Sequence, residues 1–102
     1  MIRIVLCNCS AEEAPRLARR LVEEQLAACV NVISDVKSYY RWEGTMVVDQ
    51  EATLLIKTTT ERFDEMAEKL ASYHSYDVPE IIALDSAEVS ESYAKWVMNE
   101  LS

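Results

Sequence analysis

Two cysteines separated by one residue, Cys7 and Cys9, are the first side chains in this sequence that could bind a metal. If both lie on a strand they point to the same face, and paired thiolates bind soft ions such as Cu(I) or Zn(II). Two ligands do not complete a site, and the only histidine, His74, is distant in the sequence. A cysteine in a buried strand also packs as a small hydrophobic side chain. The sequence alone therefore leaves both ligation and core packing open for this pair.

His74 follows a predicted helix and is close in sequence to Tyr73, Tyr76 and Asp77. Its imidazole could be one metal ligand, a general acid or base, or a charged group at the negative end of the helix dipole. Carboxylates could provide oxygen ligands for a hard cation, and solvated surface charge is the alternative for most of them. The carboxylates in and after the predicted hairpin are Glu43, Asp49, Glu51 and Glu80.

The sequence lacks the motifs that mark common catalytic sites. It contains no glycine-rich phosphate loop and no Gly-x-Ser-x-Gly, and its spacing supports no Cys-His-Asp constellation. An enzyme needs an activated nucleophile or base, and only His74 and Lys57 are candidates for that role. We therefore expect a binding protein and no enzymatic activity.

The composition predicts a single domain over residues 1–102, because the chain is short and half of its residues are hydrophobic. The net charge of −8 and the scattered Lys and Arg argue against a nucleic-acid partner. No run reaches the ~18 apolar residues that a membrane span needs, and the first eight residues resemble a strand more than a signal peptide. Three cysteines, an odd number, fit a disulfide framework poorly. We expect a cytoplasmic protein without a membrane partner.

A long hairpin, from Cys29 to Thr58 with its turn at Glu43-Gly44, must position many of these groups. Period-2 alternation on both sides of Gly44, the only glycine, predicts two strands. Strands of about 13 residues approach ~43 Å, whereas a compact chain of about 100 residues has a radius of gyration near 13 Å. The tip should project and carry exposed apolar residues, so we expect an oligomer. The alternative is a shorter, bent hairpin in a monomer, with a bulge near Ser34-Asp35.

Simple alternation also predicts which hairpin residues share a face. On the first strand these are Val30, Val32, Val36, Tyr40 and Trp42, and on the second they are Met46, Val48, Ala52, Leu54 and Ile56.

Four further elements flank the hairpin. We predict strands at 2–7 and 80–84, a helix from the Ser10 to Glu13 capping box through Ala28, and a helix with its apolar stripe over 63–73. Pro15 indicates that the first helix begins late or distorted. A last amphipathic helix covers 89–101. The order βαββαβ followed by a helix predicts an α+β, ferredoxin-like fold with both main helices on one face of an antiparallel sheet. The other face has no cover except the last helix, which again favours an oligomer.

Several segments resemble the CutA divalent-cation tolerance family in order and spacing. They are Leu26 to Asn31, Ser38 to Gly44, Glu51 to Thr58, His74-Ser-Tyr-Asp-Val-Pro-Glu-Ile81 and Tyr93-x-x-Trp96. Together they cover nearly the whole chain. This chain differs at Tyr73, where some members of the family carry a second histidine, and at Ser75, where proline is usual.

The resemblance implies a ferredoxin-like homotrimer whose hairpins pair between subunits, with a role in tolerance of copper and other divalent cations. It implies Cys7 and His74 as metal contacts, with copper or another divalent cation as a ligand that folding does not require. It also implies a cleft between subunits, formed by Trp42, Glu51, Lys57, Glu80, Tyr93 and Trp96. The alternative function is a signalling or scaffold trimer, similar to the PII proteins, that binds a small metabolite or a protein partner in that cleft.

Overall fold

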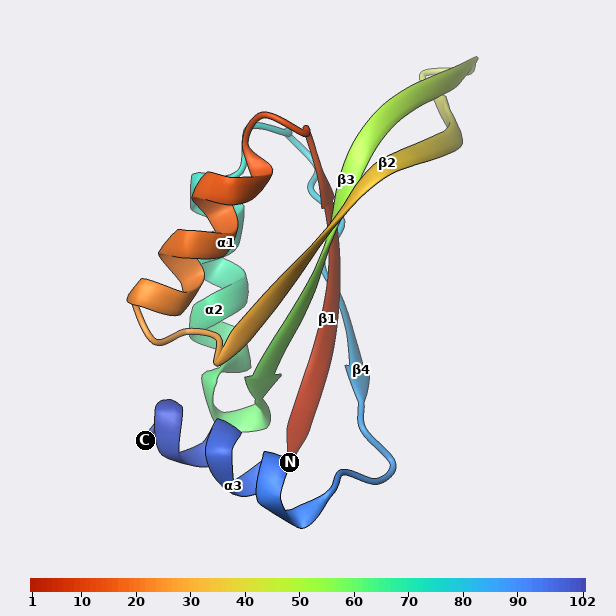
Figure 1. Cartoon of the computed structure of the whole chain (residues 1–102). Coiled ribbons are helices and arrows are strands. Elements are labelled where there is room, and N and C mark those ends of the chain that lie inside the picture. The colour runs from red at the N-terminus through yellow and green to blue at the C-terminus, as the bar shows by residue number, and fades with distance from the viewer.

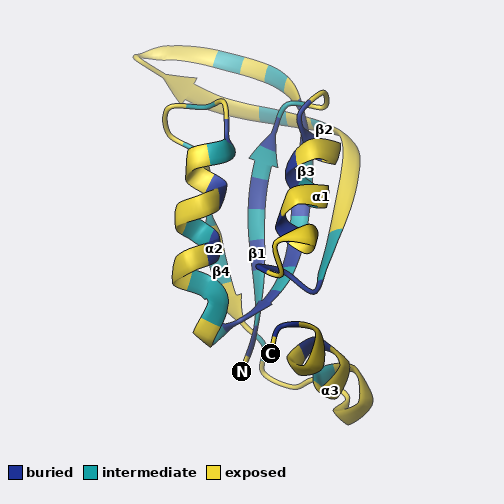
Figure 2. Ribbon diagram, turned by 90° about the vertical axis from the view of Figure 1, so that its left-hand side faces the viewer, coloured by how far each residue is buried: buried dark blue, intermediate teal, exposed yellow.

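The computed structural model describes all residues from 1 to 102, and its order of elements confirms the predicted ferredoxin-like fold. The elements are β1 (Ile2–Cys9), α1 (Ala14–Glu23), β2 (Cys29–Trp42), β3 (Thr45–Thr59), α2 (Thr60–Tyr73), β4 (Ile82–Asp85) and α3 (Glu91–Glu100). The strands form one antiparallel sheet in the order β2-β3-β1-β4. Both α1 and α2 cover the same face of this sheet, and α3 lies beyond one end of it (Figures 1 and 2). No helix is long and apolar enough to cross a membrane.

The core lies between the sheet and the two covering helices. Every second residue of β1 and β3 points to the face that the helices cover, as a strand period of two requires, and these residues are buried. The helices add side chains at helical spacing, including Leu17 and Leu21 from α1 and Met66 and Leu70 from α2. The sheet contributes Val5, Cys7, Cys9, Ala52, Leu54 and Ile56. Cys7 and Cys9 therefore share a face, as predicted, and that face is the hydrophobic core.

The opposite face of the sheet carries a row of apolar side chains and has no cover within the chain. The strand register places Leu6, Leu55 and Ile82 in one row across the sheet, because directly paired residues share a face. Ile82 and Leu84 are each about half exposed. The last helix, α3, does not cover this row, since it packs through Val97 and Leu101 in a separate small cluster.

The hairpin keeps its predicted length and turn. Strand pairing continues to Trp42 and Thr45, and the turn places Glu43 and Gly44 at φ of 49° and 80°. Two successive positive φ angles match the twist of the strands, and Gly44 adopts its angle without a Cβ clash. The hairpin extends well beyond the helices (Figure 1), in a molecule 45 Å long. Met46 and Tyr39 near the tip are 58% and 64% exposed.

A β-bulge interrupts the hairpin and overturns one prediction about its faces. Two residues, Ser34 and Asp35, lie between Ile33 and Val36 on β2, opposite only one between Thr53 and Glu51 on β3. Asp35 has φ of 59°. One extra residue transfers every later side chain of the strand to the other face. Val30 and Val32 face the core, whereas Val36, Tyr40 and Trp42 face the open side of the sheet. The expectation that all five share one face was wrong. The bulge lies at Ser34-Asp35, where the alternative reading of the hairpin put it.

The first helix is shorter than predicted at both ends. It begins at Ala14, so Pro15 occupies an early position where its missing N–H costs no helical bond. It ends at Glu23, since Gln25 has a left-handed φ of 56°. The amides of Leu26 and Ala27 then both donate to the carbonyl of Leu21. These two residues are buried as their spacing indicated, but in a turn rather than in a helix.

Two other predicted features differ by one or two residues. β1 continues to Cys9, and β4 runs from Ile82 to Asp85 in place of 80–84. Thr59 caps α2 by accepting a hydrogen bond from the Arg62 amide. The Ser10–Glu13 capping box does form, because the backbone amide of each residue donates to the side chain of the other.

Candidate functional site

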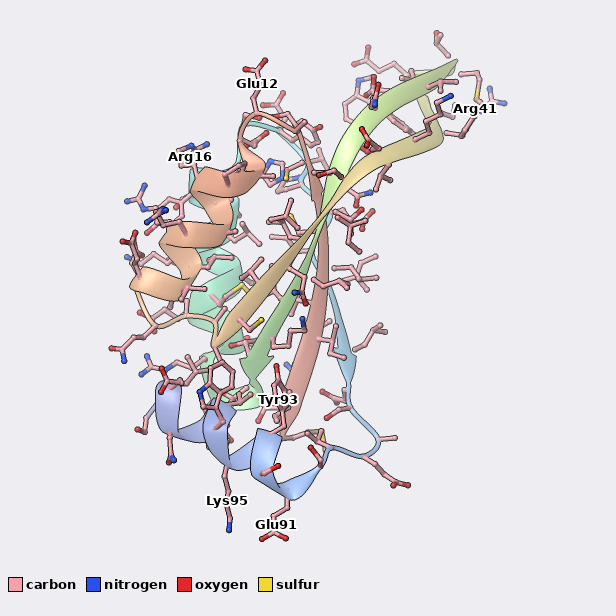
Figure 3. The ribbon with its side chains drawn as sticks, viewed as in Figure 1. Glu12, Arg16, Arg41, Glu91, Tyr93 and Lys95 are labelled. Carbon is pink, nitrogen blue, oxygen red and sulfur yellow. The ribbon has the colours of Figure 1, made fainter.

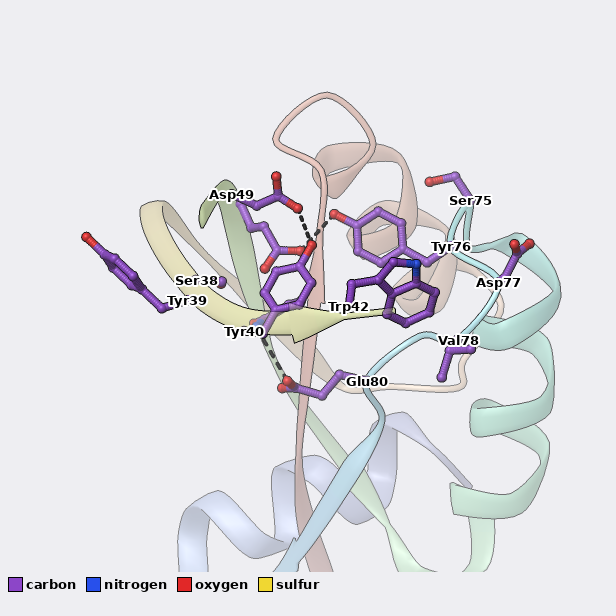
Figure 4. A pocket seen from close by; sticks show the side chains of 12 residues that line it. Ser38, Tyr39, Tyr40, Trp42, Asp49, Ser75, Tyr76, Asp77, Val78 and Glu80 are labelled. Atoms are coloured by element: carbon purple, nitrogen blue, oxygen red, sulfur yellow. Dashed lines mark hydrogen bonds between the residues drawn. The ribbon is translucent and has the colours of Figure 1, made fainter. Parts of the chain in front are cut away.

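A pocket of about 700 Å³ lies where the hairpin leaves the sheet, beside the loop that joins α2 to β4. Acidic and aromatic side chains dominate its lining, and no Lys or Arg takes part. Figure 4 shows Tyr40, Trp42 and Tyr76 facing the pocket, with Tyr39 pointing outward. The lining residues are Asn8, Ser38, Tyr39, Tyr40, Trp42, Asp49, Glu51, Ser75, Tyr76, Asp77, Val78 and Glu80.

The bulge in β2 is what brings the aromatic and acidic groups together. After it, Ser38 pairs with Asp49 and Val36 with Glu51, so the even residues of β2 share a face with the odd residues of β3. Tyr40 and Trp42 therefore lie on the same side as the two carboxylates. Without the extra residue, the rings would lie on the opposite face.

Glu51 is the most buried acidic residue of the pocket, at 5% exposure. Its Oε2 accepts a hydrogen bond of 2.8 Å from the Tyr76 hydroxyl, while Oε1 has no partner in the chain. Burial and this hydrogen bond raise the pKa of Tyr76, which keeps the hydroxyl a donor at neutral pH. No Lys, Arg or His forms an ion pair with Glu51. The charge of Glu51 is therefore not balanced by any cationic side chain of its own chain.

The other polar groups of the pocket are linked by hydrogen bonds. The Tyr40 hydroxyl donates to Asp49 Oδ2, and this bond raises the pKa of Tyr40. The amide of Asn8 donates to Glu80 Oε1 at 3.4 Å and accepts from the Thr53 hydroxyl at 2.7 Å. Tyrosines and an amide thus hold one oxygen of each carboxylate, and leave the other oxygen able to accept a bond from a ligand.

His74 lies beneath the pocket, and both of its ring nitrogens are hydrogen-bonded to backbone. Its side chain is fully buried. Nδ1 accepts from the Tyr76 amide at 3.1 Å, and Nε2 lies 2.9 Å from the Asn8 carbonyl, to which it must donate. These bonds correspond to the neutral tautomer with its proton on Nε2. The His74 and Tyr76 rings are also 4.6 Å apart. His74 therefore positions Tyr76 and Asn8, two lining residues.

Cys7 reaches the same backbone carbonyl from the core side. Its sulfur lies 3.7 Å from the Asn8 oxygen, so Cys7 and His74 share one acceptor. Burial, with nearby Cys9 and acidic groups, raises the pKa of Cys7 to about 12. A thiol with that pKa carries its proton at neutral pH, whereas metals bind the thiolate. The chain contains no group of three or more His, Cys, Asp or Glu side chains placed to hold a metal ion. One chain therefore offers no coordination site for a metal at these two residues.

The six residues of the expected cleft fall into two separate groups. Trp42, Glu51 and Glu80 line the pocket. Lys57 lies six residues along β3 from Glu51, roughly 20 Å away at the usual rise of a strand, and it donates to Asn31 Oδ1. Tyr93 and Trp96 lie on α3, at the end of the molecule opposite the hairpin tip marked by Arg41 (Figure 3). Their rings are 5.7 Å apart and each is partly exposed.

The sequence analysis missed the residues that complete the pocket from distant segments. Asn8 comes from β1, and Tyr76 comes from the loop after α2. Asp49 was considered only as one of several possible oxygen ligands from the hairpin. The available signal for Asn8 was its place between two core cysteines, because alternation then points it to the open face. Nothing local showed that Tyr40 and Asp49 would line the same pocket, since only the bulge brings them to one face.

The fold and the pocket define a ferredoxin-like domain with a projecting hairpin and an acidic, aromatic pocket at its base. The profile of the family described as "CutA1 divalent ion tolerance protein" matches residues 3–100. The "Divalent-cation tolerance protein CutA" of Thermus thermophilus is 47% identical over 98 residues, which is 95% of each chain. The chain therefore belongs to the CutA family of divalent-cation tolerance proteins.

Two solved structures show the same fold. One is described as the "Periplasmic divalent cation tolerance protein CutA from Archaeoglobus fulgidus", with a TM-score of 0.96, 33% identity and full coverage of both chains. The other is the "PII-like protein CutA from Nostoc sp. PCC 7120 in apo form", with a TM-score of 0.93 and 31% identity. The alignment with this second structure covers 98% of the present chain and 97% of the Nostoc chain.

Proposed function

We propose that this protein is a homotrimer that binds cations in clefts between its subunits, and that divalent ions are among its ligands. Glu51 is the observation that carries the proposal. It is a buried carboxylate that lines a pocket without basic residues and has no ion pair in its own chain. A cation from outside the chain would compensate its charge. Membership of the divalent-cation tolerance family supports the same class of ligand.

Assembly is supported by the open face of the sheet and by the hairpin. Leu6, Ile82 and Leu84 form part of an apolar surface that no element of the chain covers, and such surfaces mark interfaces. A contact between the hairpin end of one chain and the α3 end of the next would be heterologous, and such contacts form a ring when the rotation between subunits closes. Three subunits is the number that the family resemblance implies.

In such a ring the two separated groups of cleft residues would meet between chains. Lys57, Tyr93 and Trp96 of one subunit would adjoin Trp42, Glu51 and Glu80 of the next. One lysine opposite four carboxylates leaves the cleft negative, so it would still attract cations.

The assembly has a direct test in Ile82→Glu, which puts a charge on the open face at a half-exposed position. We expect monomers in light scattering after size exclusion, because a buried, unpaired charge in the interface is costly. Val22→Glu on the outer side of α1 is the matched control, since Val22 is similarly exposed. Cation affinity retained in the monomer would contradict a shared site.

The ion itself is argued from the ligand atoms. Carboxylate oxygens suit hard divalent ions, which keep much of their water shell. Copper bound by Cys7 and His74 has weaker geometric support, because the thiol must lose its proton and the ring must give up a backbone bond. The fold depends on an apolar core, so we expect folding without metal.

Calorimetric titration with Mn²⁺ and with Cu²⁺ tests this assignment. Glu51→Gln should weaken Mn²⁺ binding about tenfold or more, whereas Glu88→Gln, an exposed position outside the pocket, should leave it unchanged. If Cu²⁺ affinity falls in His74→Ala and not in Glu51→Gln, the metal site belongs to His74 and this assignment is wrong.

The second candidate function is a PII-like signalling or scaffold trimer, in which the cleft receives a metabolite or a protein partner. It is favoured by a pocket of about 700 Å³ with aromatic walls, which is large for a single ion. Thermal-shift screening against small metabolites tests it, since a ligand of the native state raises the melting temperature.

We also propose a binding role rather than catalysis, and a cytoplasmic location. Both nitrogens of His74 are engaged, and Lys57 lies far from the pocket of its own chain. An enzymatic turnover that the wild type shows and that Glu51→Gln loses would contradict the binding role. Cell fractionation tests the second, for which the three unpaired cysteines fit a reducing compartment.

A further inference from the structure

None of the acidic side chains of the pocket has a cationic partner in the chain. Every ion pair of the chain lies elsewhere, on β1 with β4 or on the helices and the turn before α1. In the pocket, Asp49, Glu51 and Glu80 accept hydrogen bonds from neutral donors only. Neutral donors orient a carboxylate and leave its charge in place. The pocket is thus prepared for a positive charge that the chain does not provide.

The remaining walls favour an organic cation over a bare metal ion. Tyr40, Trp42 and Tyr76 contribute ring faces, which attract ammonium groups and pack against methylene groups. Aromatic carbons do not ligate divalent metals, and no three metal-ligating side chains converge in the chain. The cavity of about 700 Å³ also exceeds what one hydrated ion fills.

The positions of the carboxylates favour a ligand with more than one amino group. Asp49 and Glu51 leave the same face of β3 two residues apart, so their Cα atoms are separated by roughly 7 Å. Each has one oxygen bonded to a tyrosine hydroxyl, and the other oxygen lacks a partner in the chain. Glu80 adds a third carboxylate from the far side of the pocket. Two ammonium groups joined by a short methylene chain would match this arrangement.

We propose that the pocket binds a linear di- or polyamine, with ammonium groups on Asp49 and Glu51 and its methylene chain against Tyr40 and Trp42. This inference rests on the proposal that the pocket is a cation site, and it names the class of ligand. Glu51, which is buried and lines the pocket, carries the largest share because its charge has no neutralising partner in its own chain.

The test is calorimetric titration of the full-length, assembled protein with 1,4-diaminobutane. Two probes of similar length are matched controls, namely 1,4-butanediol, which lacks charge, and butylamine, which has one amino group. We expect binding of the diamine, weaker binding of butylamine and none of the diol. Glu51→Gln should weaken diamine binding about tenfold or more. Asp49→Asn, at a less buried position, gives a second variant if Glu51→Gln does not fold. Glu88→Gln should behave as wild type.

The outcomes separate this inference from the proposed function. If Mn²⁺ binds in a Glu51-dependent manner and the diamine does not bind, the proposed cation site is supported and the inference of an amine ligand is wrong. If the diamine binds and no divalent ion does, the inference stands and the divalent part of the proposal fails. Equal affinity for the diol and the diamine, or equal diamine affinity in Glu51→Gln and Glu88→Gln, overturns the inference. Failure of all cations to bind overturns both.

Discussion

Two glutamates of this protein are similarly buried and have opposite surroundings. Glu13, at 7% exposure, accepts hydrogen bonds from the backbone and hydroxyl of both Ser10 and Ser75. Glu51, at 5% exposure, accepts one hydrogen bond, from Tyr76. The first joins the turn before α1 to the loop after α2. The second lines a pocket.

The contrast distinguishes a structural carboxylate from one that is available for binding. Burial alone would raise the pKa of Glu13, but the hydrogen bonds from Ser75 and Ser10 outweigh it and the pKa is lowered. The folded state thus stabilises the charged form of Glu13. Glu51 has only one such bond and no ion pair, so binding of a cation can provide the missing stabilisation. Burial by itself does not separate the two roles, whereas the number and type of partners does.

Removing the structural carboxylate should have the largest effect on stability. Glu13→Ala leaves the amides of Ser10 and Ser75 without their acceptor, and we expect a loss of about 3 kcal/mol in the free energy of unfolding. Urea denaturation at fixed protein concentration measures it. Glu12→Ala, an exposed neighbour, should change stability by less than about 0.5 kcal/mol. Equal losses in both variants would remove the distinction between Glu13 and an ordinary surface residue.

Neutralising Glu51, the pocket carboxylate, should change cation affinity and leave stability almost unaffected. Glu51→Gln keeps an acceptor for the Tyr76 hydroxyl and removes an uncompensated charge, so stability should stay within about 1 kcal/mol of wild type or rise. Cation affinity should fall as described above. A large loss of stability with unchanged affinity would make Glu51 a second structural carboxylate.

The pH dependence of stability should follow Glu13. In the unfolded chain a glutamate binds its proton near pH 4.3, and in the folded chain Glu13 does so only at lower pH. The contribution of Glu13 to the free energy of unfolding is therefore complete above about pH 4.3, and it is lost as the pH falls through the pKa of Glu13 in the folded chain. Urea denaturation across this range should show a shallower acid decline for Glu13→Gln than for wild type. Parallel curves for the two proteins would contradict the stabilised charge.

A separate effect on stability, smaller than that of Glu13→Ala, concerns the bulge that gives the pocket its aromatic wall. Asp35 has φ of 59°, where a β-branched side chain is strained. Asp35→Val should cost about 1–2 kcal/mol, and Asp35→Gly should be close to neutral. If valine is tolerated as well as glycine, then the bulge relaxes and the register of Tyr40 and Trp42 is not held by Asp35.

The fold was predictable because its signals are periodic and local. Alternation on both sides of Gly44, capping boxes and helical stripes each depend on neighbours in sequence. The prediction was wrong where a single backbone conformation changed the pattern. The left-handed Gln25 ended α1 early, and the bulge at Asp35 exchanged the faces of β2.

The pocket was only partly predictable. The resemblance provided Trp42, Glu51 and Glu80, but the partners that orient the two carboxylates, Tyr76 and Asn8, come from distant segments. Lys57 lies along β3 away from the pocket, and Tyr93 and Trp96 lie on α3. Whether they complete the site depends on assembly, which the sequence of one chain does not encode locally.

The most direct test of the role of Glu51 is a crystal structure of the assembled protein grown with 1,4-diaminobutane at neutral pH. We predict a closed ring of subunits, with an amino group of the ligand within hydrogen-bond distance of Glu51 Oε1. The contradictory result is an ion pair between Glu51 and a Lys or Arg of a neighbouring subunit, with no ligand in the pocket. Glu51 would then be as fully satisfied as Glu13, and the two carboxylates would have the same structural role.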